Sequence, residues 1–177
     1  MICGRNQSCG KQTILIYRQM EDISFRRAAL SDVTEIKRLF TETVLTINRK
    51  DYTAEETADW ASCGERPGHW ERLIGGLHFI VAVNAGGCIT GFAAIRCDGY
   101  LHSMFVHKDY QRQGIATQLL RIMEGYAVAN GLKTITSEVS ITARPFFERH
   151  GYDVLAEQQA QANKLRMTNY KMAKTIR

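Results

Sequence analysis

Residues 107–125 read HKDYQRQGIATQLLRIMEG, and the character of the chain changes at Gly114 in this stretch. Strongly polar residues precede the glycine. The apolar residues that follow it recur at helical spacing and are Ile115, Leu119, Met123 and Tyr126. The sequence therefore predicts a helix that begins just after Gly114 and ends before Gly131. The unpaired amides of such a helix start, with the helix dipole behind them, form a cradle that binds phosphate groups.

Strands are predicted on both sides of this cradle. Three segments before it are rich in β-branched and aromatic residues, are separated by the turn sequences AGG and RCDG, and predict consecutive antiparallel strands. These segments span residues 79–84, 88–95 and 100–106. Four further strands are predicted at residues 23–28, 133–140, 153–160 and 164–174.

Two helices are predicted between the first strand and residue 70. The first carries apolar side chains at three- and four-residue steps over residues 33–47, and Asp32 followed by Glu35 is typical of a helix start. Thr53 and Glu56 form a capping-box pattern at the start of a second, shorter helix.

The order of the elements predicts one α+β domain over residues 23–177, with a last helix at residues 143–151. Residues 1–22 show little periodicity, and we expect them to form a poorly ordered extension. No apolar run approaches the roughly 18 residues that a membrane crossing needs. The five cysteines and five histidines are scattered without metal-ligand spacing, so we expect reduced thiols, no metal and a cytoplasmic protein.

The charge balance excludes few classes of ligand or partner. The net charge of +5 favours an anionic ligand, but Lys and Arg are spread along the chain rather than gathered on one helix. This distribution argues against the nucleic-acid-binding module that the basic balance would otherwise suggest.

The cradle sequence QRQGIA resembles the Gln/Arg-x-x-Gly-x-Gly/Ala signature of the GNAT superfamily of acyl-CoA-dependent N-acyltransferases. About 27 residues later, SITARPFFERHGYDV is similar to the strand-to-helix segment of that family. With DYTAEETADWAS, YLHSMFV and MTNYKM, residues 23–177 resemble its YafP-like bacterial branch. The resemblance implies the GNAT fold, a central, mostly antiparallel sheet flanked by helices, and transfer of an acetyl group from acetyl-CoA to a primary amine.

The resemblance also implies where acetyl-CoA binds. Met104, Phe105 and Val106 would offer strand backbone to the pantetheine arm, because the neighbouring strand splays away there. The pyrophosphate would lie on the cradle residues, which are Gln111, Arg112, Gln113, Gly114, Ile115, Ala116 and Thr117. Ser140 stands where many members have a cofactor-contacting Asn, and Phe147 where many have a Tyr that protonates the leaving thiolate.

The catalytic groups follow less directly from the resemblance. Phe147 has no proton to give, so either Tyr170 on the last strand supplies it or the thiolate leaves unassisted. His102 stands where this branch tends to have an acidic residue, and a neutral histidine there accepts the amine proton. A structural histidine and a packed strand tyrosine are the alternative readings of these two positions.

The acceptor should lie opposite the cofactor, with Tyr52, Trp60 and Trp70 as lining residues. Nothing in the sequence distinguishes a small-molecule amine from a protein amine, and a homodimer is compatible with the pattern. A sensor that binds acyl-CoA without turnover is the rival hypothesis, because it would account for Phe147 and His102 together.

Overall fold

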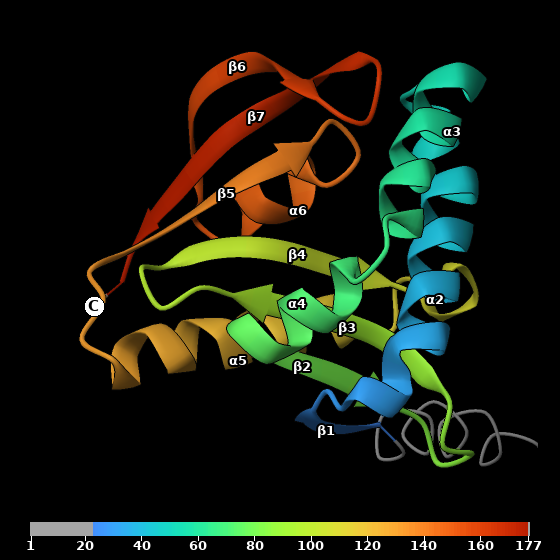
Figure 1. The fold of residues 1–177 in the computed structure, drawn as a ribbon. Helices are drawn as coiled ribbons and strands as arrows, with labels where there is room; N and C mark the ends of the chain where they lie inside the picture. The colour runs from blue at the N-terminus through green and yellow to red at the C-terminus, as the bar shows by residue number, and fades with distance from the viewer. Residues whose placement is uncertain (1–22, 177) are drawn as a thin grey trace, which may run out of the picture.

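The structure, a computed structural model, describes residues 23–176 of the chain. The expected extension at residues 1–22 lies outside the described residues. A seven-stranded sheet with the order β1-β2-β3-β4-β5-β7-β6 forms the centre of the fold (Figure 1). The strands are β1 (Ser24–Arg27), β2 (His78–Val83), β3 (Ile89–Ile95), β4 (Tyr100–Val106), β5 (Thr134–Ser140), β6 (Asp153–Gln161) and β7 (Arg166–Thr175).

Helices cover both faces of the sheet. One hydrophobic cluster joins α2, α3 and α4 to one face, and a second joins α5 and α6 to the other. The helices are α2 (Val33–Thr46), α3 (Ala54–Ser62), α4 (His69–Gly76), α5 (Ile115–Ala129) and α6 (Arg144–Arg149). All neighbouring strands are antiparallel except β4 and β5. The predicted α+β fold with a mostly antiparallel sheet is confirmed.

The sheet is split along the boundary between β4 and β5. These strands run parallel and pair at only two positions, Tyr100 with Thr136 and Leu101 with Ser137. The Ser137 hydroxyl donates to the Leu101 carbonyl at 2.9 Å, and beyond this point the strands diverge (Figure 1). A β-bulge lies at the same point, because Ala94 faces Ser103 while the next residue, Ile95, faces Leu101. His102 is therefore the extra residue of β4.

Helix α5 lies beneath both parts of the split sheet, since it packs against β2, β3, β4 and β5. Its close approach requires Gly91 on β3. A Cβ at that position would lie 3.0 Å from the Ile115 side chain and 3.1 Å from the Phe105 carbonyl oxygen. The predicted start and end of this helix are confirmed, with Gly114 (φ 82°) before it and Gly131 (φ 70°) after it.

Helices α2 and α3, which precede β2 in the sequence, begin in different ways. The capping box of α3 is confirmed: the Thr53 hydroxyl accepts from the Glu56 amide at 3.2 Å, and the Glu56 carboxylate accepts from the Thr53 amide at 2.8 Å. Helix α2 begins directly after Asp32, as predicted, but the Asp32 side chain does not cap it. Its carboxylate instead binds the Arg26 guanidinium at 2.7 and 2.9 Å and the Ala29 amide at 2.8 Å.

Helix α4 is not predicted by the sequence. It has only eight residues, contains two glycines, and follows Gly68 in a left-handed conformation without a capping side chain. The side of α4 that carries Trp70 and Ile74 is buried. Within residues 23–176, no helix combines the length and the apolar character that a membrane crossing requires.

Candidate active site

The edge of β4 that faces the split has backbone groups without a strand partner in the described part of the chain. The His107 amide donates to the Thr90 carbonyl on β3 at 2.9 Å. Because such bonds alternate along an antiparallel pair, Met104 and Val106 direct their backbone groups away from β3, toward the split. The pairing with β5 ends at Leu101, so the backbone groups of Met104 and the amide of Val106 are open to a ligand.

The carbonyl of Val106 is held from two other elements. The Gln111 side chain donates to it at 2.6 Å, and the Thr43 hydroxyl of α2 donates to it at 3.2 Å. Gln111 also donates to the His107 carbonyl at 3.3 Å. Gln111 therefore fastens the cradle loop to the end of β4, which leaves the main-chain amides of the loop to bind a ligand.

The cradle at the start of α5 has the geometry of an anion site. Arg112 (φ 62°) and Gly114 (φ 82°) both adopt left-handed conformations, which turn successive amides toward one concavity. No side chain caps the helix, and its first turn contains no acidic residue. A Cβ at Gly114 would meet nothing within 4 Å, so the space beside this residue is open. Ile115 is buried in the core and can contribute only its amide.

His150 makes a contact at the cradle that the sequence does not predict. The Nδ1 atom of His150 lies 2.8 Å from the Phe146 carbonyl oxygen, and Nε2 lies 3.3 Å from the Thr117 hydroxyl. Because a carbonyl only accepts, Nδ1 carries a proton and donates to the Phe146 carbonyl. His150 thus fixes the end of α6 against the first turn of α5.

His102 lies at the bulge of β4, where the split opens. Its Nδ1 is 2.7 Å from the Ser103 hydroxyl, and its ring packs edge-on against Tyr100 with 6.1 Å between centroids. The ring keeps contact with solvent, yet the protein around it removes part of its hydration. This desolvation, followed by the charges of His69 and Arg96, holds the pKa of His102 below its usual value. The neutral, proton-accepting form therefore dominates at neutral pH.

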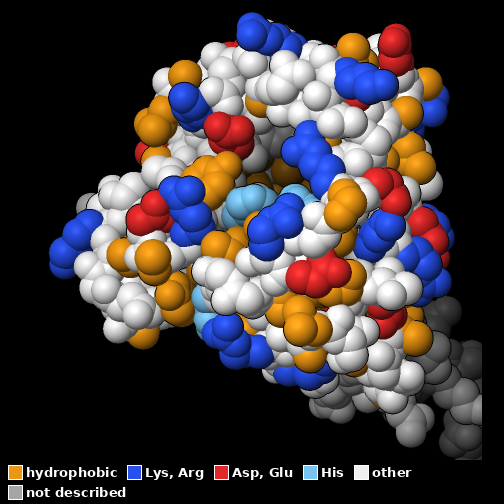
Figure 2. Space-filling view, viewed as in Figure 1, with side chains coloured by type: hydrophobic (Ala, Val, Ile, Leu, Met, Phe, Trp, Pro, Cys, Tyr) orange, Lys and Arg blue, Asp and Glu red, His pale blue; other side chains and the backbone are white. Residues whose placement is uncertain are grey.

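A hollow opens near the middle of the face shown in Figure 2, where Figure 1 has the wide end of the split beside α3. Histidine side chains lie at its rim, hydrophobic side chains lie inside it, and Lys or Arg side chains border it (Figure 2). Trp60 of α3 is half-buried and packs against Phe105 of β4 with 6.2 Å between ring centroids. Helix α3 thus lies next to the open edge of β4 on this face.

Residues of β5 and β7 divide between the two faces of the sheet. Val139 pairs with Tyr170, and both pack in the cluster of α5 and α6, with the Arg144 guanidinium 4.5 Å from the Tyr170 ring centroid. The next pair, Ser140 and Asn169, faces the side of α2 to α4 because side chains alternate along strands. Tyr170 therefore lies on the face of the cradle.

Ser140 and Asn169 differ in how their polar groups are paired. The Ser140 hydroxyl accepts from the Ala143 amide at 3.2 Å and so supports the turn before α6. The amide oxygen of Asn169 is buried without a hydrogen-bond partner among residues 23–176. A buried polar atom of this kind is uncommon and is satisfied by a donor from a ligand or water. The sequence pattern alone does not indicate a role for Asn169.

Three residues that the sequence suggested for ligand contact lie in the core. Phe147 is 4% exposed and packs edge-on against Tyr152 with 5.1 Å between centroids, so its side chain is part of the core. Trp70 is 3% exposed and donates from Nε1 to the Gly64 carbonyl at 3.0 Å. Tyr52 is 7% exposed, and its hydroxyl is fully used within the protein. Of the acceptor candidates, only Trp60 keeps a partly open surface.

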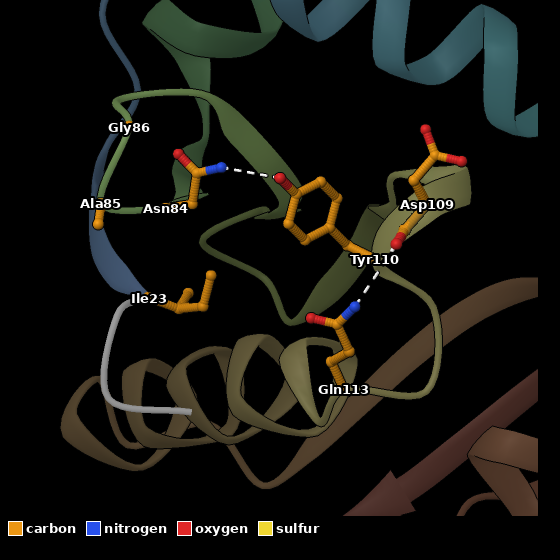
Figure 3. A pocket seen from close by; sticks show the side chains of 7 residues that line it. All are labelled: Ile23, Asn84, Ala85, Gly86, Asp109, Tyr110 and Gln113. Atoms are coloured by element: carbon orange, nitrogen blue, oxygen red, sulfur yellow. Dashed lines mark hydrogen bonds between the residues drawn. The ribbon is translucent and has the colours of Figure 1, made fainter. Parts of the chain in front are cut away.

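The cavity drawn in Figure 3 lies outside the split. It has a volume of about 470 Å³ and is open to solvent between Ile23, the turn at residues 84–86 and the loop before α5. Asn84 donates to the Tyr110 hydroxyl at 2.8 Å, and Gln113 is the only cradle residue that lines it (Figure 3). The cavity lies beside the loop before α5, and neither His102 nor Tyr170 lines it. Among residues 23–176, no three acidic, His or Cys side chains are placed to hold a metal ion.

Comparisons with known proteins agree with this geometry. The profile of a family described as acetyltransferase (GNAT) domain matches residues 48–174. The uncharacterized N-acetyltransferase YafP of Escherichia coli K12 is 27% identical over 154 residues, which cover 86% of this chain and 96% of that protein.

Solved structures share the fold. A GCN5-related N-acetyltransferase from Rhodopseudomonas palustris superimposes with a TM-score of 0.84 at 23% identity, covering 87% of this chain and 96% of that one. The PaiA N-acetyltransferase from Thermoplasma acidophilum, solved with coenzyme A, has a TM-score of 0.71 at 16% identity, with coverages of 86% and 98%. At these identities the likeness shows that the split sheet is the GNAT fold.

The position of Tyr52 generates a prediction about stability. Its hydroxyl donates to the Thr168 carbonyl at 2.7 Å and accepts from the Ile141 amide at 2.9 Å. Tyr52→Phe leaves that amide unpaired, and we expect the free energy of unfolding to fall by about 1–3 kcal/mol. Urea denaturation measures the change. Tyr126→Phe, which removes a hydroxyl without a protein partner in the described residues, is the matched control, and equal stabilities of the two variants would contradict the assignment.

Proposed function

The chain belongs to the acetyltransferase (GNAT) family, and from this membership we propose that residues 23–177 form one N-acetyltransferase domain that acetylates a primary amine with acetyl-CoA. One observation carries the proposal beyond the family: the open edge of β4 leads directly into the cradle before α5. A single extended ligand with a thioester arm and a pyrophosphate fits such a path.

Acetyl-CoA fits the groups that the protein presents. The amides of the first turn of α5 and the left-handed residues Arg112 and Gly114 would hold the pyrophosphate. The open backbone groups of Met104 and the open amide of Val106 would pair with the amide groups of the pantetheine arm. The Thermoplasma acidophilum protein of the same fold was solved with coenzyme A, which supports coenzyme A as the ligand.

In the proposed reaction, the amine nitrogen attacks the thioester carbonyl carbon, a C–N bond forms and the C–S bond breaks. His102 takes the proton that the amine loses, since it lies at the start of the split and is neutral at working pH. An open amide of β4 stabilises the negative charge that develops on the carbonyl oxygen. The sulfur leaves with its electron pair and is protonated by Tyr170 or departs as thiolate.

The opposite placement of the two side chains supports these roles. Tyr170 packs with the cluster of α5 and α6, the face on which the cradle opens. His102 borders the split beside His69 of α4, on the other face. A base on the acceptor side and an acid on the cofactor side suit direct transfer between two substrates that enter from opposite faces.

The proposal is tested by incubating the protein with acetyl-CoA and a panel of small amines and lysine peptides, with release of free thiol as the readout. Amine-dependent release is expected. Tight binding of acetyl-CoA without release from any amine would favour the sensor. A cytoplasmic location is part of the proposal and fits the unpaired thiols of Cys63, Cys88 and Cys97.

The cradle generates a prediction about binding. Gly114→Glu places a carboxylate in the open space before the amides, where it repels a pyrophosphate, so we expect acetyl-CoA affinity to fall at least tenfold by calorimetry. Gly131→Glu is the matched control, because this residue is also left-handed and open but lies at the other end of α5. Equal affinities of the two variants would remove the phosphate site from the cradle.

A second prediction concerns the pH dependence of catalysis. A general base works in its deprotonated form, and the pKa of His102 lies below its usual value of about 6.5, so kcat/KM should fall only as the pH drops below that value. His102→Gln should lower kcat by about 10²-fold and abolish this acid limb, while acetyl-CoA affinity stays nearly unchanged. A slower variant with an unaltered pH profile would assign His102 a structural role.

A further inference from the structure

The tip of the β6–β7 hairpin is bound to α3 through one carboxylate. Asp59 accepts hydrogen bonds from three consecutive backbone amides, those of Asn163, Lys164 and Leu165, at 2.8–3.0 Å. The three amides, with that of Leu165 first, hold the pKa of the Asp59 carboxyl below its usual value. Because all three amides bind the same charged carboxylate, the hairpin tip is fixed at one point on the helix.

Side chains near Asp59 make further hydrogen bonds to the hairpin tip. The Asn163 side chain donates to the Ser62 hydroxyl at 3.0 Å and accepts from the Arg66 guanidinium at 3.0 Å. Arg66 also reaches the Ala162 carbonyl at 3.4 Å. The segment from Asp59 to Arg66 therefore binds both backbone and side-chain groups of the hairpin, which lies about 100 residues later in the sequence.

This contact lies across the split in the sheet. Helix α3 packs on the half that contains β2, β3 and β4, whereas the hairpin belongs to the half that contains β5. The strands of the two halves pair only at Tyr100 and Leu101, which is the narrow end of the split. At the wide end, α3 and the hairpin lie together in Figure 1, above the region where β4 and β5 are furthest apart.

We propose that Asp59 is a positioning residue that braces the wide end of the split and thereby sets the width of the cleft for the pantetheine arm. The proposal rests on the proposed function, because the arm is that of acetyl-CoA. The cradle is built from α5 and the loop after β4, so it does not involve the brace. Loss of the brace should therefore weaken the contacts of the arm and leave those of the phosphates intact.

The experiment compares two ligands on the full chain. Acetyl-CoA has the arm, and 3′-phosphoadenosine 5′-diphosphate is the same molecule without it. In Asp59→Asn, an amide with one acceptor oxygen replaces a carboxylate that serves three N–H groups. We expect acetyl-CoA affinity to fall about tenfold, which corresponds to the net contribution of about one hydrogen bond. Affinity for the armless ligand should change less than about twofold.

Asp153→Asn is the matched control, since Asp153 is an exposed aspartate of the same hairpin whose side chain has no polar partner among residues 23–176. Hydrogen exchange at the amides of residues 163–165 should accelerate in Asp59→Asn alone. If that variant does not fold, Asn163→Ala tests the brace from the hairpin side, with the same difference between the two ligands expected.

The outcomes separate the brace from the proposed function. Faster exchange at the tip with unchanged acetyl-CoA affinity would overturn the positioning role, and so would an equal loss for both ligands. Unaltered exchange in Asp59→Asn would overturn the brace itself. Failure of the wild-type protein to bind acetyl-CoA would overturn the proposed function, whereas binding that is equal in wild type and variant overturns only the brace.

Discussion

The early separation of β4 from β5 governs the arrangement of the whole molecule. Two residue pairs hold the strands together, and the bulge at His102 marks the point where they part. A sheet interrupted in this way leaves polar backbone groups without partners, which is costly unless a ligand or another element satisfies them. The Val106 carbonyl is satisfied by Gln111 and Thr43, and the groups that remain are those that a substrate can use.

A split sheet needs contacts that cross the gap, and the fold supplies them on both faces. Below, α5 packs against strands of both halves, and Gly91 lets it approach closely enough to do so. Above, α3 binds the β6–β7 hairpin through Asp59. The first contact is a buried apolar surface and resists displacement, whereas the second consists of hydrogen bonds at a solvent-accessible site and is the more easily altered of the two.

The two faces of the sheet also separate the proposed catalytic residues. The cradle at the start of α5 and Tyr170 belong to the face of α5 and α6, while α2, α3 and α4 cover the other face, beside which His102 lies. This separation follows from the strand period of two, which directs neighbouring residues to opposite sides. The bulge adds one residue to β4 and so changes which side chains of that strand point toward the split.

The sequence was sufficient for the strands and for α5 with its glycine-flanked ends, because local rules govern each of them: period, turn residues and left-handed glycines. The burial of Phe147, Trp70 and Tyr52 followed instead from packing between elements far apart in the chain. An aromatic residue on a helix has the same local pattern whether it lines a cleft or fills a core. The contacts of Asp59 with residues 163–165 likewise join distant segments, and only the folded arrangement brings a helix carboxylate to three amides of a hairpin tip.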